Sequence, residues 1–150
     1  MQKFIQTIEC SVRYVKLQPD GRTLDAREVW LVEAYSYGEA QNRLGLALSK
    51  YAQDGADGLF VQQMKSVYYA ERLADDEAAK QRYWRVRVKL TDRSPDTGKE
   101  SSVTQQWLVR ADTMGRATKV ATETMDDSCE MVAVTEVKYN GYIKRLSAFN

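Results

Sequence analysis

Cations alternate with apolar residues along one short segment of the chain, where they could bind a polyanion. Arg85, Arg87 and Lys89 occupy every second position, so in an extended strand they project from the same face. Basic side chains on a sheet bind phosphates, and aromatic rings beside them stack on unpaired bases. The segment therefore predicts a binding face for single-stranded nucleic acid.

A second basic segment near the end of the sequence adds aromatic rings. Lysine, tyrosine and arginine interleave over residues 138–145, and Arg13 is the first-half residue that we align with Arg87. The predicted nucleic-acid-binding residues are Arg13, Arg85, Arg87, Lys89, Lys138, Tyr139, Tyr142, Lys144 and Arg145. A merely solvated face is the competing interpretation, because basic residues are ordinary on the wet face of an antiparallel sheet.

Patterns typical of catalysis and metal binding are missing from the sequence. It contains no histidine, which removes Ser–His and Cys–His nucleophile pairs and the commonest general base. Cys10 and Cys129 are isolated from each other, and no P-loop or G-x-G-x-x-G pattern occurs. The acidic clusters at 75–77 and 126–130 fall where solvated carboxylates usually lie. We predict no catalytic residue, no metal site, no cofactor and no enzymatic activity.

Charge and composition limit the partners and the location. The 22 basic and 21 acidic residues almost cancel, so the chain has no global field to steer a polyanion, and binding would need a local patch. Two cysteines are fewer than the disulfide framework of a small secreted domain usually contains. No segment has the length and apolar character of a secretory signal or a membrane span. We expect a cytoplasmic protein with reduced thiols and no membrane partner.

The elements that position these residues occur twice along the chain. Trp-Leu-Val-x-Ala at residues 30–34 recurs at 107–111, and each block is followed by a hydroxyl residue, glycine and alanine. A Val-Arg pair precedes each block, at 12–13 and 86–87. Self-similarity of this kind indicates a tandem duplication.

Each copy has the pattern of a ββαβ unit. Residues 85–90 alternate with the period of a half-buried strand, and a Pro-Asp turn after the first strand of each copy predicts a hairpin. Ser36 with Glu39 three residues later predicts a capping box at the start of a helix, and Thr113 takes the cap position in the second copy. Strand two is apolar on both faces where it ends, so we place it inside the sheet.

A long third strand completes each copy, at about 59–72 and at about 131–145. It is predicted to lie antiparallel beside strand one, and its length makes it a candidate for pairing between copies. The fold class is α+β, with antiparallel sheets and one helix per copy packed on one face. The predicted organisation is a first copy at 1–73, a charged linker at 74–82 and a second copy at 83–150, the two copies forming one compact domain with pseudo-twofold symmetry.

The order of these blocks resembles the domain-of-unknown-function 4494 family, known mainly from gut bacteria and their mobile elements. The resemblance covers roughly residues 8–146. It rests on the Val-Arg strand, the Trp-Leu-Val-x-Ala block with its hydroxyl cap, and Tyr83-Trp84 where a strand opens. It implies a phage or mobile-element setting but no activity, cofactor or functional residue.

We therefore predict a non-enzymatic binding protein that associates with single-stranded nucleic acid through a basic and aromatic sheet face. One alternative is a protein-interaction or assembly module, with a protein partner or a homo-oligomer formed through the long third strands. Another is a site for a small ligand such as a nucleotide between the two copies, because pockets often form at such interfaces.

Overall fold

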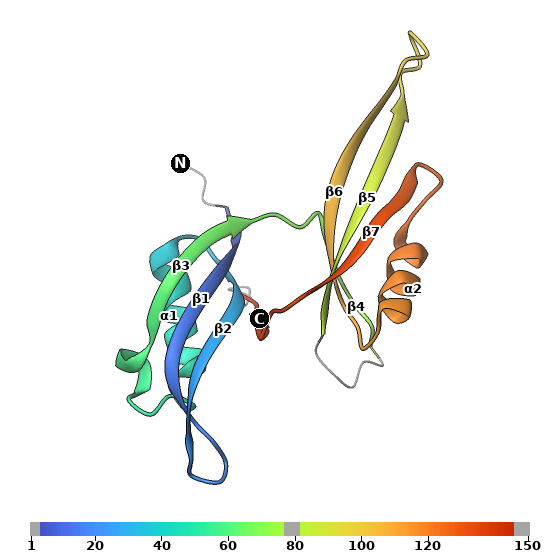
Figure 1. The fold of residues 1–150 in the computed structure, drawn as a ribbon. Coiled ribbons are helices and arrows are strands. Elements are labelled where there is room, and N and C mark those ends of the chain that lie inside the picture. The colour runs from blue at the N-terminus through green and yellow to red at the C-terminus, as the bar shows by residue number, and fades with distance from the viewer. Residues whose placement is uncertain (1–3, 77–81, 146–150) are drawn as a thin grey trace. The chain divides into compact units, whose positions relative to one another are not determined.

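The computed structural model describes residues 4–76 and 82–145, which form two four-stranded sheets with a helix packed on each (Figure 1). The α+β class and the repeated ββαβ order are confirmed. The elements in chain order are β1 (Gln6–Leu17), β2 (Thr23–Ala34), α1 (Tyr37–Leu48), a 3₁₀ turn (Gly55–Gly58), β3 (Phe60–Val67), β4 (Glu71–Ala74), β5 (Tyr83–Arg93), β6 (Glu100–Arg110), α2 (Met114–Thr124), β7 (Cys129–Val137) and β8 (Gly141–Ile143).

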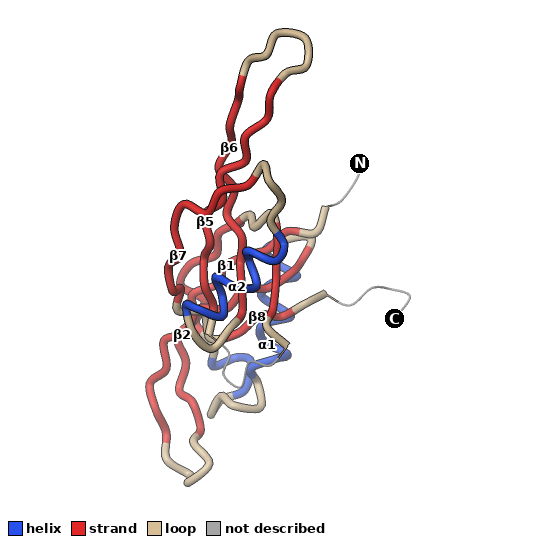
Figure 2. The backbone as a smooth tube through the Cα atoms, turned by 90° about the vertical axis from the view of Figure 1, so that its right-hand side faces the viewer, coloured by secondary structure: helices blue, strands red, loops and turns tan. Residues whose placement is uncertain are grey.

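Both predicted hairpins form, because turn chemistry and alternation agree. β1 pairs antiparallel with β2 and β5 with β6, and the β5–β6 ladder continues beyond Cys129, the first residue of β7, to its turn (Figure 2). Gly21 and Gly98 have φ of 86° and 70° in the two turns, a conformation that glycine adopts without strain. Val86 is buried against α2 while Arg87 is exposed, so the predicted faces of this strand are confirmed.

Both predicted helix caps are present. The Ser36 hydroxyl accepts a hydrogen bond from the Glu39 backbone N–H at 3.1 Å, and the Thr113 hydroxyl accepts one from Arg116 at 3.2 Å. The Glu39 carboxylate, however, accepts from the backbone N–H of Tyr35 and not from the cap residue, so the reciprocal half of the capping box is absent. In the part of the chain that the structure describes, no helix is long and apolar enough to cross a membrane.

The third strands are shorter than predicted. β3 and β7 lie antiparallel beside β1 and β5, as expected, but they end at Val67 and Val137. The segments predicted as single strands over 59–72 and 131–145 are each divided in two, because their second parts pair with a different sheet.

The short fourth strands are exchanged between the copies. β4 follows the first copy but pairs parallel with β6 of the second, and β8 follows the second copy but pairs parallel with β2 of the first. The sheet orders are β3-β1-β2-β8 and β4-β6-β5-β7, so strand two is internal in both sheets, as its apolar faces predicted.

The exchange changes how the chain divides. One unit contains Met1–Tyr68 with Tyr139–Asn150, and the other contains Tyr69–Lys138. These units differ from the sequential halves 1–73 and 83–150. The predicted linker 74–82 contributes the end of β4 at its start, and its residues 77–81 lie outside the described part of the chain.

Strand registers also fix which residues of the two copies are equivalent. Trp30 lies opposite Cys10 and Trp107 opposite Val86, and one residue further along each first strand its pairing with the third strand shifts register. Arg13 is therefore equivalent to Lys89, two residues beyond the position aligned from the sequence. A two-residue shift keeps every side chain on its face, because strands have a period of two.

Gly141 begins β8 where the backbone passes over the indole ring of Trp30. A Cβ atom at this position would lie 2.3 Å from Cζ3 of Trp30. We expect Gly141→Ala to lower the free energy of unfolding by about 1–3 kcal/mol in urea titrations, because the core must shift to admit the methyl group. Gly38→Ala is the control, since its added Cβ has no neighbour closer than 4.0 Å. Equal effects of the two substitutions would contradict the overpacking.

Candidate functional site

The predicted nucleic-acid-binding residues are divided between the two units. The first unit contains Arg13, Tyr139, Tyr142, Lys144 and Arg145, and the second contains Arg85, Arg87, Lys89 and Lys138. We expected the terminal segment to share a sheet with Arg85–Lys89, and this prediction is wrong. The segment leaves β7 after Val137 and pairs with β2 of the other sheet.

Most of the terminal residues have structural partners within the chain. Lys138 pairs with Glu136 at 2.6 Å, and the Tyr139 hydroxyl donates to Glu9 at 3.0 Å. The segment continues into β8, which pairs with β2. Tyr142 is a half-buried member of β8, and Lys144 is exposed.

Arg145 and Arg85 are also engaged. The Nε of Arg145 lies 2.9 Å from a carboxylate oxygen of Glu39, and its guanidinium lies 4.3 Å from the ring centroid of Tyr35. Arg85 is half-buried and donates to the hydroxyl of Tyr69 at 3.4 Å.

Besides Lys144 and the ion-paired Lys138, three of the predicted cations remain exposed, namely Arg13, Arg87 and Lys89. Within residues 4–76 and 82–145, none of the three forms an ion pair or hydrogen bond through its side chain. They lie on the sheet faces opposite the helices.

Two residues that the sequence reasoning missed complete a row across the first sheet. Arg27 of β2 lies directly opposite Arg13 of β1, and Phe60 of β3 lies opposite Arg13 on the other side. Both arginines are exposed, and Phe60 is 63% exposed. Counting residues outward from the turn at Pro19-Asp20-Gly21 would have paired the two arginines.

In the paired strands β1 and β2, the acidic residue next to this row on the same face is Asp25, two residues from Arg27 along β2. Asp25 lies opposite Val15 and not in the row itself, and in the described part of the chain neither Arg13 nor Arg27 forms an ion pair. Like charges directly opposite each other destabilise a sheet. An anion bound between the two guanidinium groups would remove that repulsion.

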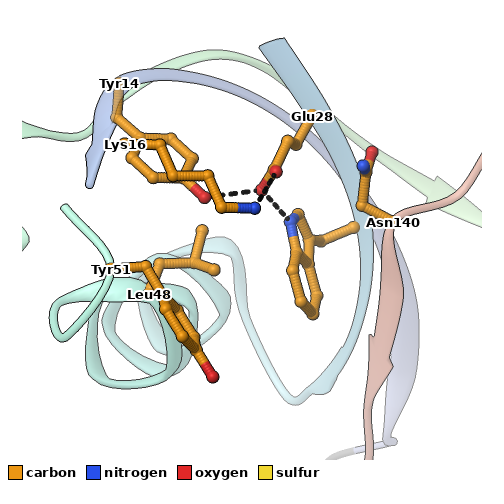
Figure 3. Close-up of a pocket in the computed structure, with 7 residues that line it drawn as sticks. Tyr14, Lys16, Glu28, Leu48, Tyr51 and Asn140 are labelled. Atoms are coloured by element: carbon orange, nitrogen blue, oxygen red, sulfur yellow. Dashed lines mark hydrogen bonds and ion pairs between the residues drawn. The ribbon is translucent and has the colours of Figure 1, made fainter. Parts of the chain in front are cut away.

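A pocket of about 360 Å³ lies on the helix side of the same sheet (Figure 3). Its lining residues are Tyr14, Lys16, Glu28, Trp30, Leu48, Tyr51 and Asn140. The buried Glu28 carboxylate accepts hydrogen bonds from the Tyr14 hydroxyl at 2.7 Å, the Trp30 indole N–H at 3.0 Å and the Lys16 ammonium at 3.1 Å. Tyr14 and Lys16 of β1 and Glu28 of β2 lie on the same face of the sheet, because all three residues face α1 in the paired register.

The donors around Glu28 determine its ionisation. Burial alone would raise the pKa of Glu28, but the hydrogen bonds from Trp30, Tyr14 and Lys16 outweigh burial and lower that pKa below its usual value. Burial, followed by the hydrogen bond to Glu28, raises the pKa of the Tyr14 hydroxyl. At neutral pH the pocket therefore contains a carboxylate, an ammonium group and a neutral phenol.

The described residues offer little for nucleophilic or metal chemistry. Burial, reinforced by the adjacent Glu9 carboxylate, raises the pKa of the Cys10 thiol to about 11, so the thiolate nucleophile is disfavoured. In the described part of the chain, no three cysteine, aspartate or glutamate side chains gather as a metal site would require. The arrangement is suited to binding through hydrogen bonds, charge and stacking.

Comparison with curated proteins finds no match. The model of a family described as a domain of unknown function, DUF4494, matches residues 7–144. This match spans both ββαβ copies and both exchanged strands, so the duplicated arrangement as a whole corresponds to one family domain. The chain belongs to the DUF4494 family.

Proposed function

We propose that this protein is a non-enzymatic binding protein that associates with single-stranded nucleic acid through the open face of its first sheet. The observation that supports it is the row of Arg27, Arg13 and Phe60, in which two exposed arginines lie directly opposite each other beside an exposed ring. We further propose a cytoplasmic location in a phage or mobile-element setting.

The arginine pair suits a phosphate. Guanidinium groups bind phosphate oxygens with paired hydrogen bonds, and a bound phosphate would neutralise the repulsion between Arg13 and Arg27. The equivalent row of the second sheet contains Lys89, Thr104 and Glu130, so the first copy is the better anion site.

The exposed ring suits an unpaired base. Phe60 lies one strand away from Arg13, at the strand spacing of about 4.8 Å, so a base could stack on the ring while its phosphate contacts the arginines. Stacking on an aromatic side chain contributes about 1–3 kcal/mol per base. A duplex keeps its bases stacked on one another, which is why the row favours single strands.

Fluorescence anisotropy with a labelled single-stranded oligonucleotide tests the proposal. We expect Arg13→Glu with Arg27→Glu to abolish measurable binding. We expect Phe60→Ala to weaken binding about tenfold, and the wild-type affinity to fall steeply as salt rises.

The matched control is the double variant Arg22→Glu with Arg93→Glu. It makes the same change in charge at two exposed arginines that already pair with Asp20 and Glu100. Equal losses in the two double variants, or binding that is insensitive to salt, would overturn the proposal. Preference for an acidic peptide over the oligonucleotide would also overturn it and would indicate a protein partner.

A further inference from the structure

The pocket around Glu28 lies on the opposite side of the first sheet from the Arg13 row, so its chemistry is independent of the proposed function. The second copy shows what this position needs for packing alone. There the residue equivalent to Glu28 is Gln105, and its side-chain oxygen accepts the Trp107 indole N–H at 3.2 Å. A neutral amide thus suffices to satisfy the tryptophan, and the charged groups of the first copy exceed that need.

The other polar groups of the pocket are also specific to the first unit. By strand register, Tyr14 is equivalent to Leu90 and Lys16 to Asp92. Asn140 precedes β8 in the first unit, where the second unit has Ala70 before β4. The two units therefore share the tryptophan but not the groups of Tyr14, Lys16 and Asn140 around it.

The net charge of the pocket indicates a neutral ligand. The Lys16 ammonium and the Glu28 carboxylate are 3.1 Å apart and cancel, and the Tyr14 hydroxyl is neutral. An anion or a cation would disturb this pair and would have to be desolvated without a net opposite charge.

The hydrogen-bond donors and acceptors of the pocket that have no second partner in the described part of the chain indicate which polar groups a ligand must present. Oε1 of Glu28 accepts from both Tyr14 and Trp30, whereas Oε2 accepts from Lys16 and has a second lone pair to accept one more N–H. The Lys16 ammonium has further protons to donate. The Asn140 side-chain oxygen accepts the Val29 backbone N–H at 2.9 Å, which leaves its NH₂ group as a donor. An acceptor next to donors is complementary to a ligand N–H beside a C=O.

The walls of the pocket specify a flat ligand. Trp30 and Leu48 line it together with Tyr51, whose ring lies beside Leu48 with the hydroxyl directed away from Glu28 (Figure 3). Tyr51 thus offers its ring face and not its hydroxyl. A volume of about 360 Å³ is at the small end of ligand sites, which suits one ring system.

We infer that this pocket binds a nucleobase or nucleoside whose ring carries an N–H beside a C=O, as uracil and guanine do. Glu28 accepts the ring N–H, Lys16 and Asn140 donate to the carbonyl oxygen, and the Tyr51 and Trp30 rings enclose the ring plane.

Isothermal titration of the full chain with uridine and with 3-methyluridine tests this inference. The methyl group replaces the ring N–H and leaves the carbonyl groups, so we expect at least tenfold weaker binding of 3-methyluridine. Tyr51→Ala should weaken uridine binding about tenfold, whereas Tyr68→Ala, at a tyrosine that is 79% exposed outside the pocket, should not.

The Arg13→Glu with Arg27→Glu variant should bind uridine as the wild type does, which separates this site from the sheet face. Absence of binding to uridine and guanosine would overturn the inference. So would equal affinities for uridine and 3-methyluridine, or equal losses from Tyr51→Ala and Tyr68→Ala.

Discussion

Asp75→Arg is expected to lower the free energy of unfolding by about 3–5 kcal/mol, and Arg116→Asp in the same chain is expected to restore most of that loss. The Asp75 carboxylate is only 7% exposed and receives two hydrogen bonds from Arg116, at 2.8 and 3.0 Å. Arginine at position 75 would place a largely buried cation against the guanidinium group of Arg116, whose side chain is 37% exposed. Urea titration of both variants at neutral pH measures the effect, and failure of Arg116→Asp to rescue would contradict the pairing.

An equivalent ion pair occurs in the other unit, with the signs of the two charges reversed. Glu39 and Arg116 are each three residues after the cap residue of their helix, and they hold Arg145 and Asp75, respectively. The charged residue that follows each exchanged strand is therefore opposite in sign to the charged residue in the first turn of the helix that it contacts. If β4 and β8 paired within their own copies, Asp75 would meet Glu39 and Arg145 would meet Arg116. The charges thus favour the exchanged pairing by penalising the alternative.

Reversing all four charges separates this explanation from a simple loss of contacts. The variant with Asp75→Arg, Arg116→Asp, Glu39→Arg and Arg145→Glu again has opposite charges at both positions. We expect its free energy of unfolding to lie much closer to that of the wild type than to that of Asp75→Arg alone. Reversing only Asp75 and Arg145 places like charges at both positions and should destabilise the protein more than either single change.

Local features of the fold were predictable because local chemistry determines them. The alternation over residues 85–90, the turn after each first strand and the hydroxyl caps Ser36 and Thr113 all specify structure within a few residues. The strand exchange was not predictable in this way. No glycine or proline marks the break between β3 and β4, and the partner of β4 is an edge more than thirty residues further along the chain.

The candidate sites likewise contain some features that the local sequence determines and others that depend on strand pairing. The face of each cation followed from alternation, but the opposition of Arg13 and Arg27 required the hairpin register. Tyr14 and Glu28 could have been placed on one face by the same register. Asn140 could not, because it reaches the first sheet only through the exchanged strand.

Glu28→Ala is expected to lower the free energy of unfolding by about 3–4 kcal/mol, because it leaves the buried Tyr14 hydroxyl and the Trp30 indole N–H without their acceptor. Glu28→Gln should cost less, about 1–2 kcal/mol, since an amide oxygen satisfies the equivalent tryptophan of the second copy. Urea titrations at pH 7 measure both values. Glu123→Gln, at an exposed position of α2, is the control and should have no effect.

The difference between wild type and Glu28→Gln should also depend on pH. The folded pKa of Glu28 lies below its ordinary value of 4.5, so ionised Glu28 contributes its full stabilisation above pH 4.5. That contribution is lost as pH falls from there through the folded pKa. The two stability curves should therefore converge in that acidic window and stay parallel at neutral pH. Curves that remain parallel below pH 4.5, or that diverge there, would show that Tyr14, Trp30 and Lys16 do not hold Glu28 in its ionised form.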